Sequence, residues 1–204
     1  MAAMRSSSPA PSAFIGAHRR MRTLFRDPLA LLFFLAAVAA EADITGCACD
    51  PADPVSMEAR LCSLSREAAK QPPEPGFFFL KDISPRKQKR TLMLPRRLEK
   101  GVYRLSDLTP KERLEFWTEA IRKAEELWGD DWGLAVNGDK VRTQCHPHIH
   151  IGKFLKASEK NNFIVINHPR QIPVPKGDGL WIHPVDKRLH VHTGEQICET
   201  VLLR

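Results

Sequence analysis

TPKERLEFWTEAIRKAEELWGDDWGLAVN, residues 109–137, is the stretch that decides the fold. Thr109 and Pro110 are followed by Glu112, which is the pattern of a capping box at the start of a helix. Apolar residues then recur at three- and four-residue spacing, so an amphipathic helix is predicted over 110–128. The residues predicted to face the core are Leu114, Trp117, Ile121, Ala124, Leu127 and Trp128. A strand over 132–137 follows, and Asn137 opens a turn.

Short strands are predicted on both sides of this helix. A helix over 56–70, with Ser56 as its N-cap, precedes an apolar strand at 77–80 and a second strand at 91–94, which suggests a hairpin. Further strands are expected at 146–151 and 163–167, and two or three more between 180 and 203. Strand pairs around a long helix, joined by hairpin-length links, predict an α+β fold with an antiparallel sheet and extra C-terminal strands.

The N-terminal segment resembles an export signal. A basic flank over 1–28 precedes twelve apolar residues, 29–40, which are too few to span a bilayer, since that takes roughly 20. Residues 1–42 are therefore interpreted as a signal peptide; a buried helix or an uncleaved anchor is the alternative. Ile44 to Cys47 also resembles a lipobox, which leaves lipidation at Cys47 open. These interpretations place the mature chain in the bacterial periplasm or cell envelope, with membrane association left open.

Charge and composition narrow the class of protein. The chain has 204 residues, 43% hydrophobic and 27% charged, which excludes a disordered acidic tail, a collagen-like fibre and a multi-span membrane protein. The net charge of +7 suggests an anionic partner. Loss of 1–42 removes five of the 31 basic and two of the 24 acidic residues, so the charge falls to +4. That imbalance is too mild to predict nucleic acid as a partner.

All five cysteines lie beyond residue 42. In an oxidising compartment Cys47 or Cys49 is expected to pair with Cys62. Because five is odd, at least one cysteine stays free, is lipidated or pairs with another chain. The remaining two are Cys145 and Cys198, and no repeated Cys-x-x-Cys pair predicts a metal site.

Three histidines alternate in Cys145-His146-Pro147-His148-Ile149-His150-Ile151. In a strand, alternate residues share one face, so the three imidazoles are expected to point the same way. One reading is a metal site, because neutral imidazole binds zinc, copper and nickel. Ligands at every second residue of one strand rarely reach a single ion, although His183, His190 and His192 could contribute. Two positions are considered for these three histidines: they line the same pocket, or they lie on the surface of an extra sheet. The surface position is favoured.

The other reading is nucleophilic catalysis at phosphorus. An imidazole nitrogen attacks a phosphate and forms a phosphoramide, which water then hydrolyses. The reaction needs a free nitrogen, a neighbour that fixes the tautomer, and donors for the phosphate oxygens. The histidine row supplies the first two requirements. Basic and polar residues nearby can supply the third: Lys140, Arg142, Thr143, Gln144 and Lys153.

The row resembles the motif of the histidine triad (HIT) superfamily, in which three histidines alternate with apolar residues. The order of neighbouring segments resembles that superfamily over roughly residues 60–155. The matching segments are Phe79 to Pro85, Thr91 to Pro95, Ser106 to Thr109 with the long helix, and Leu134 to Gly138. The stretch from Arg142 to Ile151 is similar to the CDP-diacylglycerol pyrophosphatase-like branch, whose members act at the cell envelope.

The resemblance implies roles for individual residues. His148 matches the nucleophile, and His146 and His150 match the histidines that flank it. Asn137 matches a residue that contacts phosphate or ribose, and Gln144 a polar phosphate-binding residue. Arg142 and Lys153 are further candidates for contacting phosphate.

The implied activity is that of a HIT-type nucleotide phosphoester or phosphoanhydride hydrolase, or a nucleotidyltransferase, that forms a nucleotidyl-histidine intermediate. The substrate would be a nucleotide-containing small molecule or a nucleotide-lipid, and no cofactor is expected. Many members hold zinc through a Cys-x-x-Cys pair and two histidines. This chain has Cys62 and Ser65 at that place, so no metal ligands are assigned. Many HIT proteins form homodimers, which is left open here. The alternative function is an exported metal-binding protein that uses the histidine row.

The expected organisation has four parts. Residues 1–42 form the export segment, and 43–75 the N-terminal helix with its cysteines. Residues 76–155 form the HIT-like core, and 156–204 a C-terminal β extension.

Overall fold

The computed structural model describes residues 44–204 except 83 and 85. The predicted export segment, 1–42, therefore lies outside the described residues. In the described part of the chain, no helix combines the length and the apolar character that crossing a bilayer requires.

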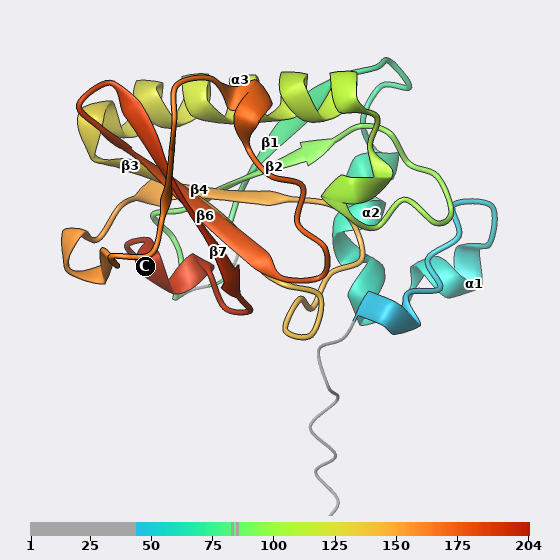
Figure 1. The fold of residues 1–204 in the computed structure, drawn as a ribbon. Helices are drawn as coiled ribbons and strands as arrows, with labels where there is room; N and C mark the ends of the chain where they lie inside the picture. Colours follow the sequence, from blue (N-terminus) through green and yellow to red (C-terminus); the bar gives the residue numbers. More distant parts are fainter. Residues whose placement is uncertain (1–43, 83, 85) are drawn as a thin grey trace, which may run out of the picture. The chain divides into compact units, whose positions relative to one another are not determined.

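One seven-stranded antiparallel sheet organises the described residues, with the strand order β1-β2-β4-β3-β6-β7-β5 (Figure 1). Its strands are β1 (Phe77–Lys81), β2 (Thr91–Pro95), β3 (Trp132–Val136), β4 (Ile149–Lys153), β5 (Ile164–Ile166), β6 (Gly179–Val185) and β7 (Arg188–Glu195). The α+β class and the antiparallel sheet are confirmed. Residues 156–204 supply β5 to β7, and because β6 pairs directly with β3, these strands extend the sheet of the preceding residues.

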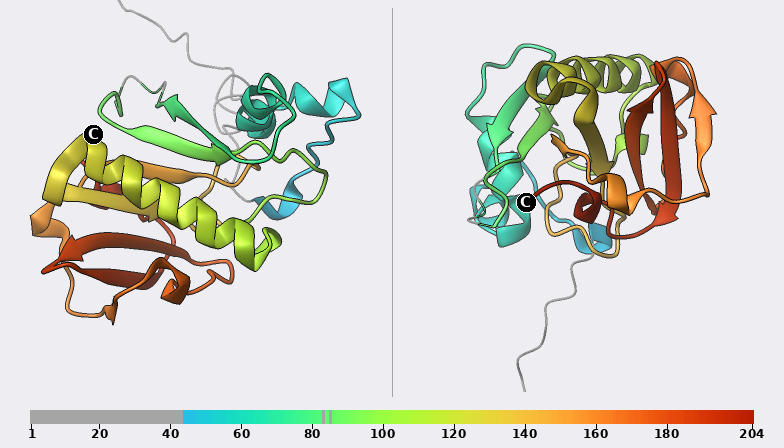
Figure 2. Two further views of the ribbon diagram at one scale, coloured as in Figure 1. Left: turned by 90° about the horizontal axis from the view of Figure 1, so that it is seen from above. Right: turned by 90° about the vertical axis from the view of Figure 1, so that its left-hand side faces the viewer.

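The long helix α3 (Pro110–Trp128) lies across one face of this sheet (Figures 1 and 2). Its start is as predicted: Thr109 Oγ1 accepts from the Glu112 backbone N–H at 3.2 Å, and Glu112 Oε2 accepts from the Thr109 N–H at 2.7 Å. The prediction of which α3 residues face the core is confirmed in part. Trp117 and Ala124 are buried, but Leu127 is 42% exposed, while Phe116 and Ala120 are fully buried.

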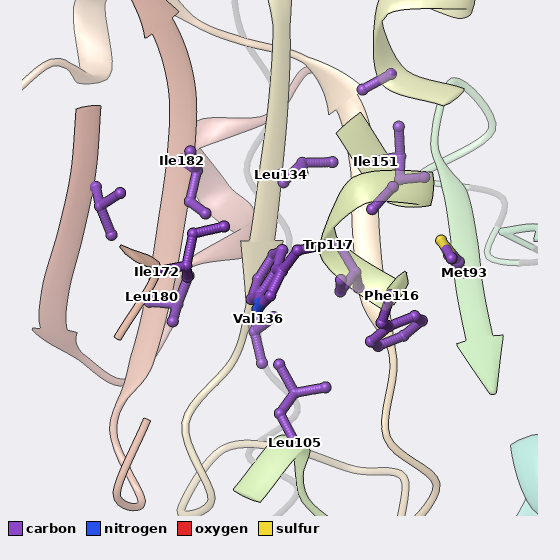
Figure 3. Close-up of a cluster of buried hydrophobic side chains, with 14 of the residues drawn as sticks. Met93, Leu105, Phe116, Trp117, Leu134, Val136, Ile151, Ile172, Leu180 and Ile182 are labelled. Carbon is purple, nitrogen blue, oxygen red and sulfur yellow. The ribbon is translucent and has the colours of Figure 1, made fainter. Parts of the chain in front are cut away.

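The main hydrophobic core fills the space between α3 and the sheet. Alternate residues of the central strands contribute to it, including Met93, Leu134, Ile151, Leu180 and Ile182, together with Phe116 and Trp117 of α3 (Figure 3). Since side chains alternate across a strand, the intervening residues lie on the opposite face of the sheet. That second face carries the histidines.

The N-terminal helix is shorter than predicted. Instead of one helix over 56–70 there are α1 (Pro54–Met57), a 3-10 turn (Arg60–Cys62) and α2 (Ser63–Ala69). Asp53 is the N-cap of α1, because its side chain accepts from the Val55 N–H at 3.0 Å. Ser56 lies inside α1, and its hydroxyl donates to the Asp53 carbonyl at 2.9 Å. Ala59 then has an extended backbone, which interrupts the helix.

Two disulfides tie this N-terminal segment together. Cys49 is bonded to Cys62, one of the predicted pairings, and Cys47 to Cys145, which had no predicted partner. The second bond occupies the Cys47 sulfur, the atom to which a lipoprotein would attach its lipid. Cys198 is the free cysteine, and burial raises the pKa of its thiol to about 12.

The C-terminal segment covers part of the second face. Leu202 is fully buried against Ala135, Phe154 and Trp181, and its carbonyl accepts from the Arg90 guanidinium at 2.7 Å. Glycines make room for it: a Cβ on Gly133 would lie 2.6 Å from Leu202 Cδ2. A 3-10 turn (Glu199–Val201) immediately before Leu202 brings Glu199 to the histidine face.

Candidate functional site: the histidine triad on the second face of the sheet

The predicted histidine strand begins later than expected. β4 starts at Ile149, so His146 and His148 precede the strand and only His150 lies in it. Pro147 lacks a backbone N–H, so it cannot donate to a neighbouring strand. The alternation argument therefore fails as a route to their orientation. All three imidazoles are nevertheless buried, with exposed fractions of 2% to 5%.

Backbone carbonyls orient the first two imidazoles. His146 Nε2 lies 2.8 Å from the Pro95 carbonyl oxygen, and His148 Nδ1 lies 2.8 Å from the His146 carbonyl oxygen. A carbonyl can only accept, so the proton must sit on Nε2 of His146 and on Nδ1 of His148. His148 therefore carries its lone pair on Nε2, and no hydrogen bond holds that nitrogen within the described residues.

His150 extends the row toward a charged group. Its ring lies edge-on to that of His148, with 5.0 Å between centroids, and its Nε2 is 3.4 Å from Glu199 Oε2. Glu199 also accepts from Lys87 at 2.5 Å and from Arg90 at 3.2 Å. The triad is thus flanked by two cations and one carboxylate, none of which the sequence indicated.

Burial keeps the three imidazoles neutral. It lowers the pKa of His146 to about 4 and that of His150 to about 3, and it depresses the pKa of His148 strongly. Nearby positive charge acts in the same direction: Arg142 on His146 and His148, and Lys87 and Arg90 on His150. At neutral pH the row therefore offers uncharged imidazole, the form that can act as a nucleophile.

Asn137 positions the carboxylate side of the site. Its Oδ1 accepts from the backbone N–H groups of Cys198 and Glu199, at 2.9 and 3.0 Å. These bonds hold the start of the 3-10 turn that carries Glu199. In the structure Asn137 thus acts on the triad through Glu199, and no hydrogen bond between Asn137 and the histidines is seen in the described part of the chain.

The predicted phosphate-binding side chains are engaged elsewhere. Arg142 is 3% exposed and donates to the Tyr103 carbonyl at 2.5 Å, and burial lowers its pKa to about 10. Gln144 Oε1 accepts from the Ser63 hydroxyl at 2.6 Å. Arg142 thus reaches the triad only through its charge, and Gln144 fastens the segment before the triad to α2.

Lys153 is not brought to the triad. It lies on β4 three residues after His150, so its side chain leaves the opposite face of the sheet. Its ammonium is 3.1 Å from Asp131 Oδ2. The structure therefore groups His146, His148 and His150 with Lys87, Arg90 and Glu199, and leaves Lys153 outside this group.

No family model and no curated protein matches the chain.

A cavity of about 620 Å³ adjoins the triad's anchor. It lies between the end of α2, the start of α3 and the end of β2, and Phe77, Arg97 and Pro95 contribute to its walls. Pro95 is the residue whose carbonyl fixes His146. The cavity therefore places apolar surface and side chains of both charges, among them Arg97 and Glu112, next to the residue that orients the row.

A second histidine cluster lies on the same face of the sheet. His183 and His192 are 2% and 1% exposed, so the expectation that the C-terminal histidines lie on the surface is wrong for these two. Both lie close to the carboxylate of Glu159, a residue that no sequence motif marked as functional. Among the described residues, three potential metal ligands bring their ligand atoms close together: Glu159, His183 and His192. None of them belongs to the triad.

Proposed function

We propose that this chain is a HIT-type hydrolase or nucleotidyltransferase that cleaves a nucleotide–phosphate bond through a nucleotidyl-His148 intermediate. The observation that carries the proposal is the hydrogen bond from His148 Nδ1 to the His146 carbonyl. It fixes the tautomer in which Nε2 has the free electron pair. A neutral, oriented imidazole with one unengaged nitrogen is what attack on phosphorus requires.

The reaction has two displacement steps. Nε2 of His148 attacks the α-phosphorus, a P–N bond forms, and the P–O bond to the leaving group breaks. The leaving oxygen departs with its electron pair and takes a proton from solvent. Water then attacks the same phosphorus and loses a proton to solvent, and the P–N bond breaks with its electron pair returning to Nε2. A nucleoside monophosphate is released with His148 restored. In a transferase, an acceptor hydroxyl takes the place of water.

Neighbouring residues have positioning and electrostatic roles in this proposal. His146 holds the His148 ring through its own carbonyl, and it is itself held by Pro95. Lys87 is the partly exposed cation beside His150, so it can approach a phosphate oxygen. Fixed positive charge near the developing negative charge of the transition state lowers the barrier.

The substrate class follows from the resemblance. We propose a nucleotide-containing small molecule or a nucleotide-lipid of the CDP-diacylglycerol type, in an exported, envelope-located protein. The mechanism assigned to His148 needs no metal cofactor. Two disulfides among the described residues support an oxidising compartment.

A substrate panel with a nucleophile variant tests the mechanism. The purified protein is incubated with nucleoside diphosphate esters, dinucleoside polyphosphates and CDP-diacylglycerol, and the products are measured by mass spectrometry. His148→Ala should lower turnover of the active substrate at least about a thousandfold, as for other nucleophile deletions. His168→Gln, which removes an exposed histidine outside the site, serves as the control.

Trapping the intermediate adds an independent readout. Alkaline quenching preserves phosphoramides, so the peptide that contains His148 should carry the added mass of a nucleotidyl group in the wild type and the control. The same peptide should be unmodified in His148→Ala. Turnover that survives in His148→Ala would refute the proposed nucleophile.

A further inference from the structure

Four aligned strands place two histidine clusters along one row of the sheet. His150 on β4 pairs with Ala135 on β3, Ala135 with Trp181 on β6, and Trp181 with His192 on β7. The row crosses three strand spacings of about 4.8 Å, so the backbones of His150 and His192 are about 14 Å apart. The second cluster is therefore a separate site and not an extension of the triad.

The hairpin of β6 and β7 brings the imidazoles of the second cluster together. His183 pairs with His190, and His192 pairs with Trp181, all on the face away from α3. Glu159 reaches them from the loop after the 3-10 turn Lys156–Ser158. One side chain from a loop thus meets three from a rigid hairpin.

The carboxylate of Glu159 is close to all three imidazoles. Its Oε2 lies 2.6 Å from His183 Nε2, and its Oε1 lies 3.3 Å from His192 Nε2 and 3.7 Å from His190 Nδ1. The ligand atoms of Glu159, His183 and His192 all lie within 4.8 Å of one another. Two carboxylate oxygens therefore face three ring nitrogens in one small volume.

Hydrogen bonding within the protein leaves these nitrogens unsatisfied. In the described residues, His183 Nε2, His190 Nδ1 and both ring nitrogens of His192 are buried without a hydrogen bond of good geometry. The contacts to Glu159 bring the atoms close without the angles that hydrogen bonds need. Buried polar atoms without partners are costly, so a group that supplies partners to several of them at once fits this place.

Aromatic rings hold the imidazoles in place. His183 stacks on Phe154 at 4.0 Å between centroids, His192 on Trp181 at 3.4 Å, and His190 on Phe163 at 4.0 Å. Flanking rings restrict rotation of the imidazoles, so a ligand that binds them meets a preorganised set. This is the property that separates a built site from a chance grouping of histidines.

We propose that Glu159, His183 and His192 bind one divalent transition-metal ion, Zn²⁺ by preference, with His190 as the adjacent fourth donor. Zinc takes imidazole nitrogen and carboxylate oxygen at about 2.0 to 2.2 Å in tetrahedral sites, which puts neighbouring ligand atoms about 3.3 Å apart. The separation of 3.3 Å between Glu159 and His192 already meets this value.

The carboxylate of Glu159 needs only a small movement to admit the ion. The 2.6 Å contact between Glu159 and His183 must open by under 1 Å. Glu159 is 36% exposed on a loop, so its side chain can make that movement. Because the ion would join the loop at 159 to the hairpin of β6 and β7, its role is structural. The backbone of its ligand His192 is about 14 Å from that of His150 in the triad.

Metal binding is tested on the purified full chain after dialysis against EDTA. Zinc binding is measured by competition with a chromophoric chelator, and the thermal midpoint is recorded with rising zinc concentration. We expect one zinc per chain and a midpoint that rises with zinc, because an ion that binds the folded state stabilises it. Co²⁺, used as a spectroscopic probe, should give the visible absorption of a tetrahedral site.

Variants locate the ion. Glu159→Gln keeps the size of a partly exposed side chain and should lower zinc affinity at least about tenfold, and His183→Gln with His192→Gln should abolish stoichiometric binding. His168→Gln and His146→Gln should bind zinc as the wild type does. Circular dichroism in EDTA checks that each variant folds.

Three results would overturn the proposal. They are no stoichiometric zinc in the wild type, unchanged affinity and cobalt spectrum in Glu159→Gln, and loss of zinc in His146→Gln with retention in Glu159→Gln. The last result would place the ion at the triad. Because turnover is not measured, failure of the proposed hydrolase does not affect this test.

Discussion

The buried triad makes the protein sensitive to acid, and the effect can be calculated for single residues. His150 has a pKa of about 3 in the folded chain, whereas an unfolded histidine titrates near 6.5. Between these values the unfolded state binds more protons than the folded state, so stability falls as the pH falls below 6.5. The stabilising contribution is complete above pH 6.5 and is lost toward pH 3.

The magnitude at pH 5.0 follows from the two pKa values. Protonation of the unfolded state alone lowers the free energy of unfolding by about 2 kcal/mol for His150. The same reasoning gives about 2 kcal/mol for His146, whose pKa is about 4. Their sum of about 4 kcal/mol is a large share of the 5 to 15 kcal/mol that is typical of a domain. The wild type loses unfolding free energy between pH 7.5 and pH 5.0. Replacing His150 by Gln should therefore make this loss about 2 kcal/mol smaller.

Urea unfolding at 25 °C measures this difference. The fluorescence of the buried Trp132 and Trp181 reports unfolding, with EDTA present and the ionic strength matched at both pH values. Carboxylates titrate in the same range, but their contribution cancels between wild type and variant. Leu92→Ala is the control, because Leu92 pairs with His150 in the sheet and carries no titrating group. It should lower stability equally at both pH values. A His150→Gln variant that loses as much stability as the wild type between the two pH values would refute the reasoning.

Three further predictions concern packing and cross-links. Leu202→Ala should cost about 2 to 5 kcal/mol and lower the urea midpoint, because the side chain is fully buried. Gly133→Ala should cost about 1 to 3 kcal/mol, since its Cβ meets Leu202, and this cost should be smaller in the Leu202→Ala background; additive costs would contradict the contact. Replacing both Cys47 and Cys145 by Ser should cost about 4 to 5 kcal/mol, because the bond spans 98 residues; an unchanged thermal midpoint would show that it does not form.

The sequence predicted the elements that depend on local signals. The capping box of Thr109 and Glu112 placed the start of α3, and the short apolar runs placed β1 and β2. The break between α1 and α2 was missed, because it depends on the extended backbone of Ala59 and not on a proline or glycine. Leu127 fits the helical period but is exposed, whereas the next residue, Trp128, packs against the core.

The candidate site was predictable only in its histidines. Their spacing marked His146, His148 and His150, although the alternation that suggested a common face applies to β4 only from Ile149. Glu199 reaches His150 because Asn137 holds a turn at the far end of the chain, and such a contact leaves no pattern in the sequence. Arg142 and Gln144 were read as phosphate ligands because charge and polarity, unlike burial, are visible in a sequence.

The disulfide beside the triad makes oxidative folding a determinant of the proposed activity. Four cysteines can pair in three ways, and Cys62 is nearly as close in sequence to Cys47 as to its native partner Cys49. Short loops close more readily than the long loop to Cys145, so a mispaired chain that joins Cys47 to Cys62 is an accessible trap. That chain deprives both Cys49 and Cys145 of their native partners. Cys145 lies next to His146, so the segment before the proposed nucleophile is left unfastened. It recovers only by thiol–disulfide exchange, so a glutathione redox buffer or a disulfide isomerase should raise the yield of natively paired protein, and with it the proposed activity.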